Sequence, residues 1–373
     1  MHILHTEASC GWGGQEIRIL SESAGMIERG HRVSLACPAH APIAREAPAH
    51  GIEVIALPIE KKRLGGLLAL RGLLAGRRFD VVNTHSSTDS WLAALACASL
   101  GGAPPLVRTR HISAPIARSA TNRWLYARAS AFVVTTGESL REEVVRRTGS
   151  DPARVVSIPT GIDHERFSPA DRDASRRALG LPADRFIVGI VATLRSWKGH
   201  RFLIEAVASM ADPRVLLVIV GDGPQHEALA RQIDEGGLGE RVMLVGQRAD
   251  VPAWMQAFDA FALPSYANEG VPQALIQAML CGLACVTTSA GAIGEIAIDG
   301  RTALLVAQQD SAALAGALAR LRDDAALRAR LGEAARAHCL AGFTRDAMLD
   351  RMEAVFEAAA ARSPLGRTGA APR

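Results

Sequence analysis

The chain has 373 residues, of which 49% are hydrophobic and 21% are charged, and this length favours two domains over a single core. No charge-free apolar run reaches the 18 residues that a membrane span needs, and the N-terminus lacks the basic start and apolar stretch of a secretory signal. The six cysteines show no Cys-x-x-Cys pair and no zinc-type spacing, so we expect core thiols in a reducing cytoplasm and no metal.

Positive charge is concentrated in the first part of the chain. Residues 1–168 hold twenty Lys and Arg against fifteen Asp and Glu, whereas residues 169–373 hold twenty-two against twenty-three. A basic first half suits an anionic partner such as a phosphate, a membrane surface or a nucleic acid. Aromatic residues make up only 4% and do not alternate with basic ones, which argues against nucleic acid.

Short apolar runs alternate with amphipathic stretches through the first part of the chain. Helices are predicted at 15–29, 64–77, 90–100 and 138–148. Strands are predicted at His2–Thr6, Val33–Cys37, Glu53–Leu57, Asp80–His85, Leu106–Thr109, Ala131–Thr135 and Val155–Ile158. This alternation predicts a parallel sheet covered by helices on both faces.

The same alternation restarts after a connector that contains proline and glycine, Pro159–Pro169. The later strands are predicted at Phe186–Thr193, Val215–Val220, Val242–Val245, Ala260–Leu263, Ala284–Thr287 and Ala303–Val306. We therefore predict two doubly wound α/β domains, residues 1–168 and 169–345. Residues 310–361 are rich in Ala, Leu and Arg and are predicted to be helical, and residues 362–373 have the composition of a disordered tail.

Two loops after predicted strands of the first domain carry glycines or histidines. Gly13 and Gly14 precede a helix, where glycine lets the backbone approach a ligand, but their spacing is not the dinucleotide-binding G-x-G-x-x-G. His85 follows one strand, and His111 follows another. A single histidine is more often structural, but strand carboxyl ends meet at the binding crevice of such sheets, which favours a shared pocket.

In the second domain, Lys198 stands out because lysine is so scarce. The other lysines are Lys61 and Lys62, against thirty-nine arginines, and the two cations are not interchangeable at a tight site. Lys198 follows the strand Phe186–Thr193 by a few residues. A lysine retained at this position is therefore a candidate functional residue, although it could also simply face solvent.

The stretch Pro264–Glu295 combines a carboxylate with a helix start. Glu269 and Gly270 follow a buried strand, and Pro272 stands where a helix begins. Free backbone N–H groups and the helix dipole favour an anion there, although a glutamate at that place could serve the dipole alone. We predict a site for a ligand that carries phosphate and hydroxyl groups.

These segments resemble the retaining glycosyltransferases of family 4. The E-x7-E signature of that family aligns with Glu269 and Gln277, with Gln in place of the second Glu. Gln277 can still bond a ribose hydroxyl, but it carries no charge. Further similarity lies in the Gly-Gly loop, in Gly189–Gly199, in Ser289–Glu295 and in the connector, so the resemblance spans nearly the whole chain.

The resemblance implies a GT-B fold, with two Rossmann-like domains facing each other across a cleft and a final helix, about 346–361, packed back on the first domain. It implies a hexosyltransferase-type enzyme that moves a sugar from a nucleotide-diphosphate donor, UDP-sugar or GDP-sugar, with retention and without metal or other cofactor. Related bacterial enzymes build lipopolysaccharide and other cell-surface glycans. We therefore expect a glycan or lipid-linked glycan acceptor and a cytoplasmic enzyme with possible peripheral contact with the inner membrane surface.

The resemblance also assigns roles to single residues. As catalytic residues it implies His111, Glu269, Arg195 and Lys198. As donor-binding residues it implies Gly13, Gly14, Arg195, Lys198, Gln247, Arg248, Glu269, Gly270, Val271 and Gln277. As an acceptor-binding residue it implies Gly14. Three further acceptor-binding candidates come from the strand ends of the first domain: Arg108 and Arg110, which could hold an acceptor phosphate, and His85, which could line the acceptor side.

Two other functions remain open from the sequence. A nucleotide-sugar epimerase on the same fold would convert the donor without an acceptor. A non-catalytic nucleotide-sugar-binding protein would bind the donor without turnover, and Gln277 mildly favours that alternative. The basic stretch Lys61–Arg63 before an apolar helix could contact lipid headgroups, or the helix could simply pack on the sheet.

Overall fold

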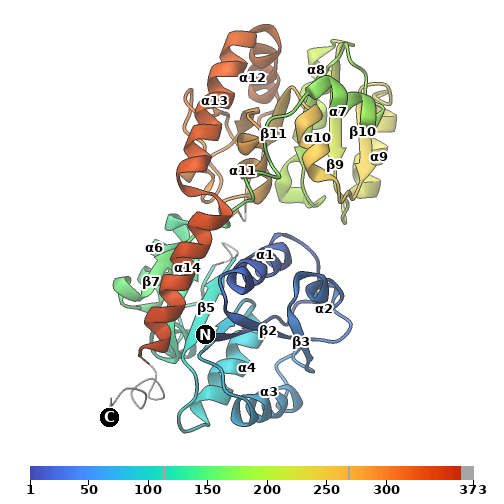
Figure 1. Ribbon diagram of the computed structural model, residues 1–373. Helices are drawn as coiled ribbons and strands as arrows, with labels where there is room; N and C mark the ends of the chain where they lie inside the picture. Colours follow the sequence, from blue (N-terminus) through green and yellow to red (C-terminus); the bar gives the residue numbers. More distant parts are fainter. Residues whose placement is uncertain (112–114, 268, 363–373) are drawn as a thin grey trace. The chain divides into compact units, whose positions relative to one another are not determined.

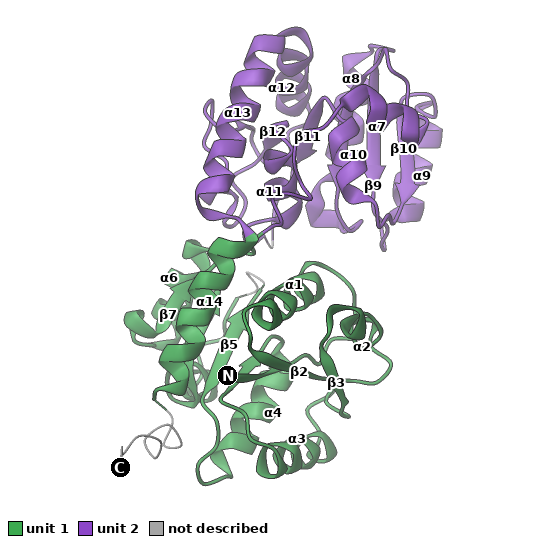
Figure 2. Cartoon of the chain, viewed as in Figure 1, with its two compact units in different colours: residues 1–161, 345–373 green, residues 162–344 purple. Residues whose placement is uncertain are grey.

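The computed structural model describes residues 1–111, 115–267 and 269–362. The chain forms two compact units (Figure 2). Unit 1 consists of Met1–Gly161 together with the C-terminal segment from Arg345 onward, and unit 2 consists of Ile162–Thr344. Each unit is built on its own parallel sheet.

The sheet of unit 1 has the strand order β3-β2-β1-β4-β5-β6-β7, and every paired strand runs parallel to its neighbour. Its strands are β1 (His2–Thr6), β2 (Arg32–Cys37), β3 (Glu53–Ala56), β4 (Val81–Thr84), β5 (Leu106–Arg110), β6 (Ser130–Thr135) and β7 (Val155–Ser157). The chain winds outward from β1 to β3 and then returns to β4 on the other side of β1. The order therefore reverses between β1 and β4, which is where ligands bind in open sheets of this kind.

Helices cover both faces of this sheet (Figure 1). They are α1 (Gly14–Glu28), α2 (Pro42–Glu46), α3 (Leu64–Gly76), α4 (Ser87–Ala98), α5 (Ala120–Arg123), the π-helical turn η2 (Trp124–Ala129), α6 (Glu138–Thr148) and α14 (Arg345–Ala360). Successive strand residues point to opposite faces of the sheet and so belong to different hydrophobic cores: Ile3 packs with α1 and α14, whereas Leu4 packs with α3 and α4. This alternation follows from the two-residue period of a strand.

The last helix, α14, belongs to unit 1 although it follows unit 2 in the sequence. Its buried face, which includes Met352 and Phe356, lies in the same core as α1. Leu349 lies against Gly25 of α1, where a Cβ atom would come within 2.3 Å of the leucine side chain. Arg29 pairs with Asp350 and Glu353 of α14 at 2.7 and 2.8 Å. Apolar packing and surface ion pairs thus fix this helix on unit 1.

The sheet of unit 2 has the order β10-β9-β8-β11-β12-β13, again with parallel pairs. Its strands are β8 (Phe186–Val191), β9 (Val215–Val220), β10 (Val242–Gly246), β11 (Ala260–Leu263), β12 (Ala284–Thr287) and β13 (Leu304–Leu305). Its helices are α7 (Arg172–Leu179), α8 (His200–Met210), α9 (His226–Glu235), α10 (Val251–Ala257), α11 (Gln273–Leu280), α12 (Ser311–Asp323) and α13 (Ala325–Gly342). Here the order reverses between β8 and β11.

The boundary between the units differs from the sequence prediction, which placed it at 168/169. Compact packing changes at Gly161/Ile162, because the connector after that point packs on unit 2. The N–H of Ile162 donates to the carbonyl of Phe343 at 3.0 Å, and Phe167 is buried in the unit 2 core. Of the tail expected at 362–373, residues 363–373 lie outside the described residues.

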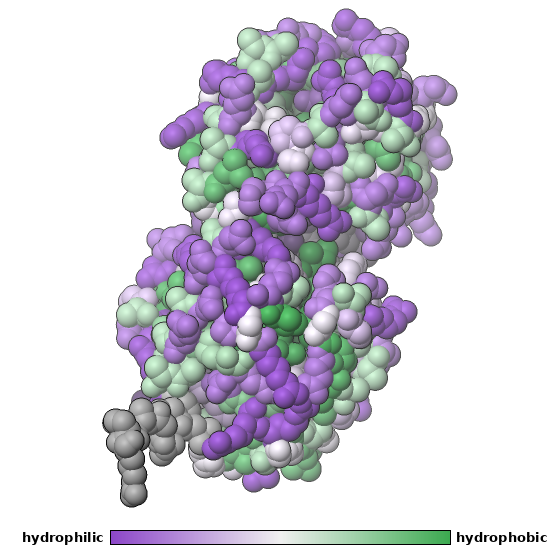
Figure 3. Space-filling model, viewed as in Figure 1, coloured by the Kyte–Doolittle hydropathy of each residue, from purple (hydrophilic) through white to green (hydrophobic). Residues whose placement is uncertain are grey.

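The surface mixes hydrophilic and hydrophobic residues on the face shown in Figure 3. Among the described helices, none combines the length and the apolar character needed to cross a bilayer. Leu64 and Leu68 of α3 are exposed by 69% and 56%. They lie one helical turn apart, so they form a small apolar patch directly after the basic residues Lys61–Arg63.

Candidate active site

The carboxyl ends of β8, β11 and β12 lead into three loops that contact one another in unit 2. The N–H of Tyr266, after β11, donates to the carbonyl of Trp197, after β8, at 2.9 Å. The N–H of Ala292, after β12, donates to the carbonyl of Glu269 at 3.3 Å. These loops surround the point where the strand order reverses, so the topology predicts a ligand site there.

An ion pair between Lys198 and Glu269 lies at this point. The Lys198 Nζ donates to Glu269 Oε1 at 2.6 Å, although the two residues are 71 positions apart. The Glu269 side chain is only 6% exposed and that of Lys198 is 21% exposed. A buried carboxylate needs such a partner, and the partly exposed ammonium stays available to an anion from solvent.

Two glycines permit the close approach of these loops. Gly199 has φ of 77°, and a Cβ atom there would lie 2.1 Å from the carbonyl oxygen of Pro264. Gly291 has φ of 57°, and a Cβ atom would lie 2.0 Å from the carbonyl oxygen of Glu269. Backbone blocks any side chain at both places, so glycine is required there.

The helix α8 begins immediately after Lys198 and Gly199. Its free N–H groups favour an anion near the lysine. His200, the first residue of α8, is buried, and burial together with the charge of Lys198 lowers its pKa to about 4. His200 is therefore neutral at physiological pH and adds no charge to the site.

Three further predicted donor residues of unit 2 are exposed. Arg195 is exposed, with its guanidinium 5.8 Å from the centre of the Trp197 ring. Gln247 and Arg248 are exposed after β10, and the Arg248 guanidinium pairs with Asp250 at 3.0 Å. Lys198 is thus in contact with Glu269, whereas Arg248 forms its ion pair after β10, which is two strands away from β8 in the sheet.

The other predicted donor residues border α11. The helix begins at Gln273 with Pro272 as N-cap, so Gly270 and Val271 precede the cap and are not in the first turn. Val271 is buried, and Gly270 is partly exposed. Gln277 lies within α11 and is partly exposed, which leaves its amide accessible for a hydrogen bond.

In unit 1, the point where the strand order reverses holds a chain of three histidines. His5 of β1 bonds His85 through Nδ1 and Nε2 at 2.8 Å. His85, after β4, bonds His111, after β5, through Nδ1 and Nε2 at 2.9 Å. His85 and His111, predicted from their strand ends to lie near one another, are therefore in direct contact, and His5 extends this chain of imidazoles into the core.

All three imidazoles are held neutral. Burial lowers the pKa of His5 to about 3, and it lowers the pKa values of His85 and His111 well below the ordinary value. A neutral ring has one N–H, so the two bonds must run in the same direction along the chain. The tautomer of His111 is thus tied to those of His85 and His5. A neutral His111 can orient a hydroxyl group but is a poor acid.

A buried pair of acids beside the histidines was not predicted from the sequence. Asp89 is the N3 residue of the capping box at the start of α4, whose N-cap is Ser86, and it accepts hydrogen bonds from the Thr6 hydroxyl at 2.7 Å and from the backbone N–H of His85 at 2.9 Å. Burial, with the charge of Asp89 as the next cause, raises the pKa of Glu7 to about 8. The sequence signal was weak: a carboxylate two residues beyond His5, at the end of the first strand.

The predicted acceptor residues Arg108 and Arg110 lie on β5, and both contact Tyr126. The Arg108 guanidinium is buried 4.4 Å from the centre of the Tyr126 ring, and Arg110 donates to the Tyr126 hydroxyl at 3.0 Å. The strand period places both on one face, whereas Thr109 bonds Asn83 on the opposite one. Gly13 caps α1 and Gly14 is its first residue, as the loop prediction requires.

Comparison with known proteins agrees with this geometry. Residues 12–166 match the family described as Glycosyltransferase Family 4, and residues 171–338 match the family described as Glycosyl transferases group 1. An Escherichia coli UDP-Gal:alpha-D-GlcNAc-diphosphoundecaprenol alpha-1,3-galactosyltransferase is 30% identical over 71% of this chain and 72% of its own length. A D-inositol 3-phosphate glycosyltransferase of Stackebrandtia nassauensis is 29% identical over 87% of this chain and 82% of its own length.

Solved structures give the same answer for the fold. The Anabaena protein Alr3699/HepE in complex with UDP-glucose is 25% identical, covers 96% of this chain and 99% of its own, and has a TM-score of 0.83. A Rickettsia africae glycosyltransferase is 18% identical, covers 97% and 99%, and has a TM-score of 0.86. The two parallel-sheet units, the matched families and the E. coli relative together show that the chain belongs to the family 4 glycosyltransferases, enzymes of GT-B fold that use a nucleotide sugar.

Proposed function

We propose that the protein transfers a hexose from a nucleotide-diphosphate sugar, a UDP-sugar or GDP-sugar, to a glycan or lipid-linked glycan acceptor, with retention at the anomeric carbon. The observation that carries the proposal is the Lys198–Glu269 ion pair at the point of strand reversal in unit 2. A cation beside a helix start suits a pyrophosphate, and a buried carboxylate suits sugar hydroxyls.

Lys198 would stabilise the leaving group. As the bond from the sugar to the diphosphate breaks, negative charge grows on the leaving oxygen, and a fixed cation stabilises that charge. Arg195, exposed on the same loop, would add a second cation to the diphosphate. With these two cations the departure needs no metal at the donor site. Glu269 would hold the sugar and Gln277 the ribose.

Unit 1 would hold the acceptor. Retention by a same-face route requires the departing phosphate to take the proton of the acceptor hydroxyl, so no strong enzymic base is needed. The neutral His111 suits a residue that orients the reacting groups without titrating. Gly13 and Gly14, at the start of α1, would let backbone approach the substrates.

The acceptor class rests on the relatives. The E. coli relative acts on a diphosphoundecaprenol-linked sugar and the S. nassauensis relative on inositol 3-phosphate, both of which carry phosphate. We propose a lipid-linked glycan of lipopolysaccharide or another cell-surface polysaccharide, reached at the cytoplasmic face of the membrane. The exposed pair Leu64 and Leu68, beside Lys61 and Lys62, supports peripheral contact with an anionic bilayer.

The test measures nucleotide affinity and transfer in the same protein. Calorimetric titration with UDP and GDP in the presence of chelator should show one preferred nucleotide. The Lys198→Ala variant loses a charge-assisted hydrogen bond worth about 1.5–3 kcal/mol, so its Kd should rise about 10- to 150-fold. Arg231→Ala is the matched control, since it removes an exposed positive charge from α9 of the same unit.

Transfer is then assayed with the preferred donor, with and without a diphosphoundecaprenol-linked acceptor. Product formation with the anomeric configuration of the donor supports the proposal, and inversion refutes retention. Conversion of the donor alone would identify an epimerase, and binding without turnover on any acceptor would favour a non-catalytic role. An unchanged Kd in folded Lys198→Ala would remove the lysine from the diphosphate site.

A further inference from the structure

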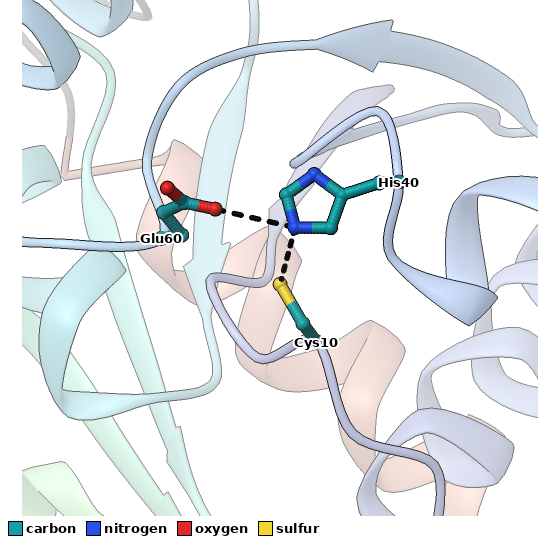
Figure 4. A group of neighbouring side chains, drawn as sticks. All are labelled: Cys10, His40 and Glu60. Atoms are coloured by element: carbon teal, nitrogen blue, oxygen red, sulfur yellow. Dashed lines mark hydrogen bonds and ion pairs between the residues drawn. The ribbon is translucent and has the colours of Figure 1, made fainter.

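Three side chains with metal-binding atoms meet at the surface of unit 1 (Figure 4). The Sγ atom of Cys10 lies 3.3 Å from Nε2 of His40, and the same nitrogen lies 3.3 Å from Oε2 of Glu60. All three atoms lie within 4.8 Å of one another. Figure 4 shows the thiol and the carboxylate directed at one imidazole nitrogen.

The fold explains why three residues so distant in sequence meet. Cys10 follows β1, His40 follows β2 and Glu60 follows β3, and these strands are neighbours in the order β3-β2-β1. Because parallel strands place their carboxyl ends at one edge, each following loop can supply one ligand to a common point. The cluster has no local sequence motif, so cysteine spacing alone could not predict it.

We propose that Cys10, His40 and Glu60 form a binding site for a divalent transition-metal ion, with Zn²⁺ as the ion that the donors fit best. Zinc accepts thiolate, imidazole and carboxylate ligands together, whereas Mg²⁺ and Ca²⁺ prefer oxygen alone. Zinc bonds of about 2.0–2.3 Å at tetrahedral angles place ligand atoms about 3.3–3.6 Å apart. The two 3.3 Å separations match this value.

The charges and the exposure of the cluster also suit a divalent ion. A metal ion displaces the proton of the Cys10 thiol, and the resulting thiolate together with the Glu60 carboxylate supplies two negative charges, which balance one divalent cation. All three ligands are exposed, so the side chains can close the widest separation by rotation. Because this separation is at most 4.8 Å, closing it to tetrahedral spacing needs a shift of at most about 1.5 Å.

A cavity of about 480 Å³ lies beside the cluster, and Cys10 and Glu60 are among its lining residues. Lys61 and the hydroxyl residues Ser86 and Ser87 line it too. Three protein ligands leave a tetrahedral ion with one open position, as in zinc sites that bind water or a ligand oxygen. The open position would therefore take water or an oxygen of an anionic ligand in this cavity.

The proposal does not depend on the proposed transfer reaction. The three ligands belong to unit 1, whereas Lys198 and Glu269 belong to unit 2. Failure of one can be distinguished from failure of the other, because metal binding is measured without donor or acceptor. Nucleotide affinity in chelator tests only the site of unit 2.

The experiment is a titration of the metal-free, full-length protein with Co²⁺, which replaces zinc and gives a thiolate-to-cobalt charge-transfer absorption. We expect saturation at one equivalent, loss of the band on addition of Zn²⁺, and no band in Cys10→Ser. His40→Ala and Glu60→Gln should each weaken the binding by about tenfold or more. Cys97→Ser and His50→Ala are the controls, because Cys97 is a partly exposed cysteine and His50 an exposed histidine of the same unit.

Thermal unfolding in chelator shows whether each variant is folded, and the exposed positions should tolerate the changes. The absence of saturable binding at one equivalent in the wild type would overturn the proposal. A band that persists in Cys10→Ser, or one lost in Cys97→Ser, would also overturn it. Retained affinity in both His40→Ala and Glu60→Gln would reduce the site to a cysteine that binds cobalt without its neighbours.

Discussion

Replacing His5 by leucine should change how the stability of unit 1 depends on pH. Burial lowers the pKa of His5 from 6.5 to about 3, so the unfolded chain binds a proton between these values that the folded chain does not. Stability therefore falls as the pH falls below 6.5. From pH 7.5 to 5.5, a histidine with so low a folded pKa loses about 1–2 kcal/mol of stability. The His5→Leu variant lacks this loss.

The pH dependence of wild-type stability alone does not report on His5, because Glu7 changes the stability in the opposite direction. Its folded pKa is raised from 4.5 to about 8, so the folded chain binds the extra proton, and acidification from pH 7.5 to 5.5 stabilises it by about 2–3 kcal/mol. His85 and His111 act in the same direction as His5. The difference between wild type and His5→Leu removes the contribution of Glu7 from this sum. Burial is the largest cause of the low pKa values of His85 and His111, ahead of the charge of His5, so the difference reports mainly on His5.

The assay is urea unfolding followed by tryptophan fluorescence at pH 7.5 and 5.5. Replacing Trp197 and Trp254 by phenylalanine in both proteins leaves three tryptophans, all in unit 1. The stability of the wild type relative to His5→Leu should fall by about 1–2 kcal/mol at the lower pH. Ser23→Ala, another buried polar position of the unit, should change stability equally at both pH values, since serine does not titrate. An unchanged difference for His5→Leu would refute a neutral, buried His5.

Two further predictions concern unit 2. Gly199→Ala places a Cβ atom against the Pro264 carbonyl at positive φ, which costs about 1–2 kcal/mol in backbone strain alone. The Kd of the preferred nucleotide should therefore rise in this variant. Gly239→Ala is the control, because this glycine has open space around it, and it should leave the Kd unchanged. Asp259 accepts hydrogen bonds from Arg172, Arg176 and the Ile187 N–H at 2.6, 2.5 and 2.7 Å. Asp259→Ala leaves the buried Arg176 without its carboxylate and should destabilise unit 2 by about 3–5 kcal/mol in urea unfolding, and a loss below about 1 kcal/mol would contradict this role.

The fold followed from the sequence because its determinants are local. Every strand was predicted to within a few residues, since short apolar runs bounded by glycine and proline mark buried parallel strands. The domain boundary was placed seven residues late, because glycine and proline mark a connector without telling which core buries it. Ile162 and Phe167 pack on unit 2 through contacts with residues that come much later in the chain.

The site was only partly predictable, for a related reason. The sequence identified Lys198 and Glu269 by their motifs, but the bond between them joins loops 71 residues apart. Arg108 and Arg110 were predicted from their strand end, but the strand period alone could not show that both contact Tyr126, which comes from a later segment of the chain. Glu7 and Cys10 carried no motif, since their partners come from other loops of the same sheet edge.

The two points of strand reversal differ in the charge of their side chains, and this difference fits the proposal that unit 1 binds the acceptor and unit 2 the donor. In unit 1, burial keeps His5, His85 and His111 neutral and favours the protonated form of Glu7 at neutral pH. In unit 2, Lys198 and Glu269 form an ion pair that leaves the ammonium partly exposed. A neutral, polar environment suits an acceptor hydroxyl whose reaction needs orientation rather than ionisation. A fixed cation suits a leaving diphosphate, because charge develops there as the sugar departs.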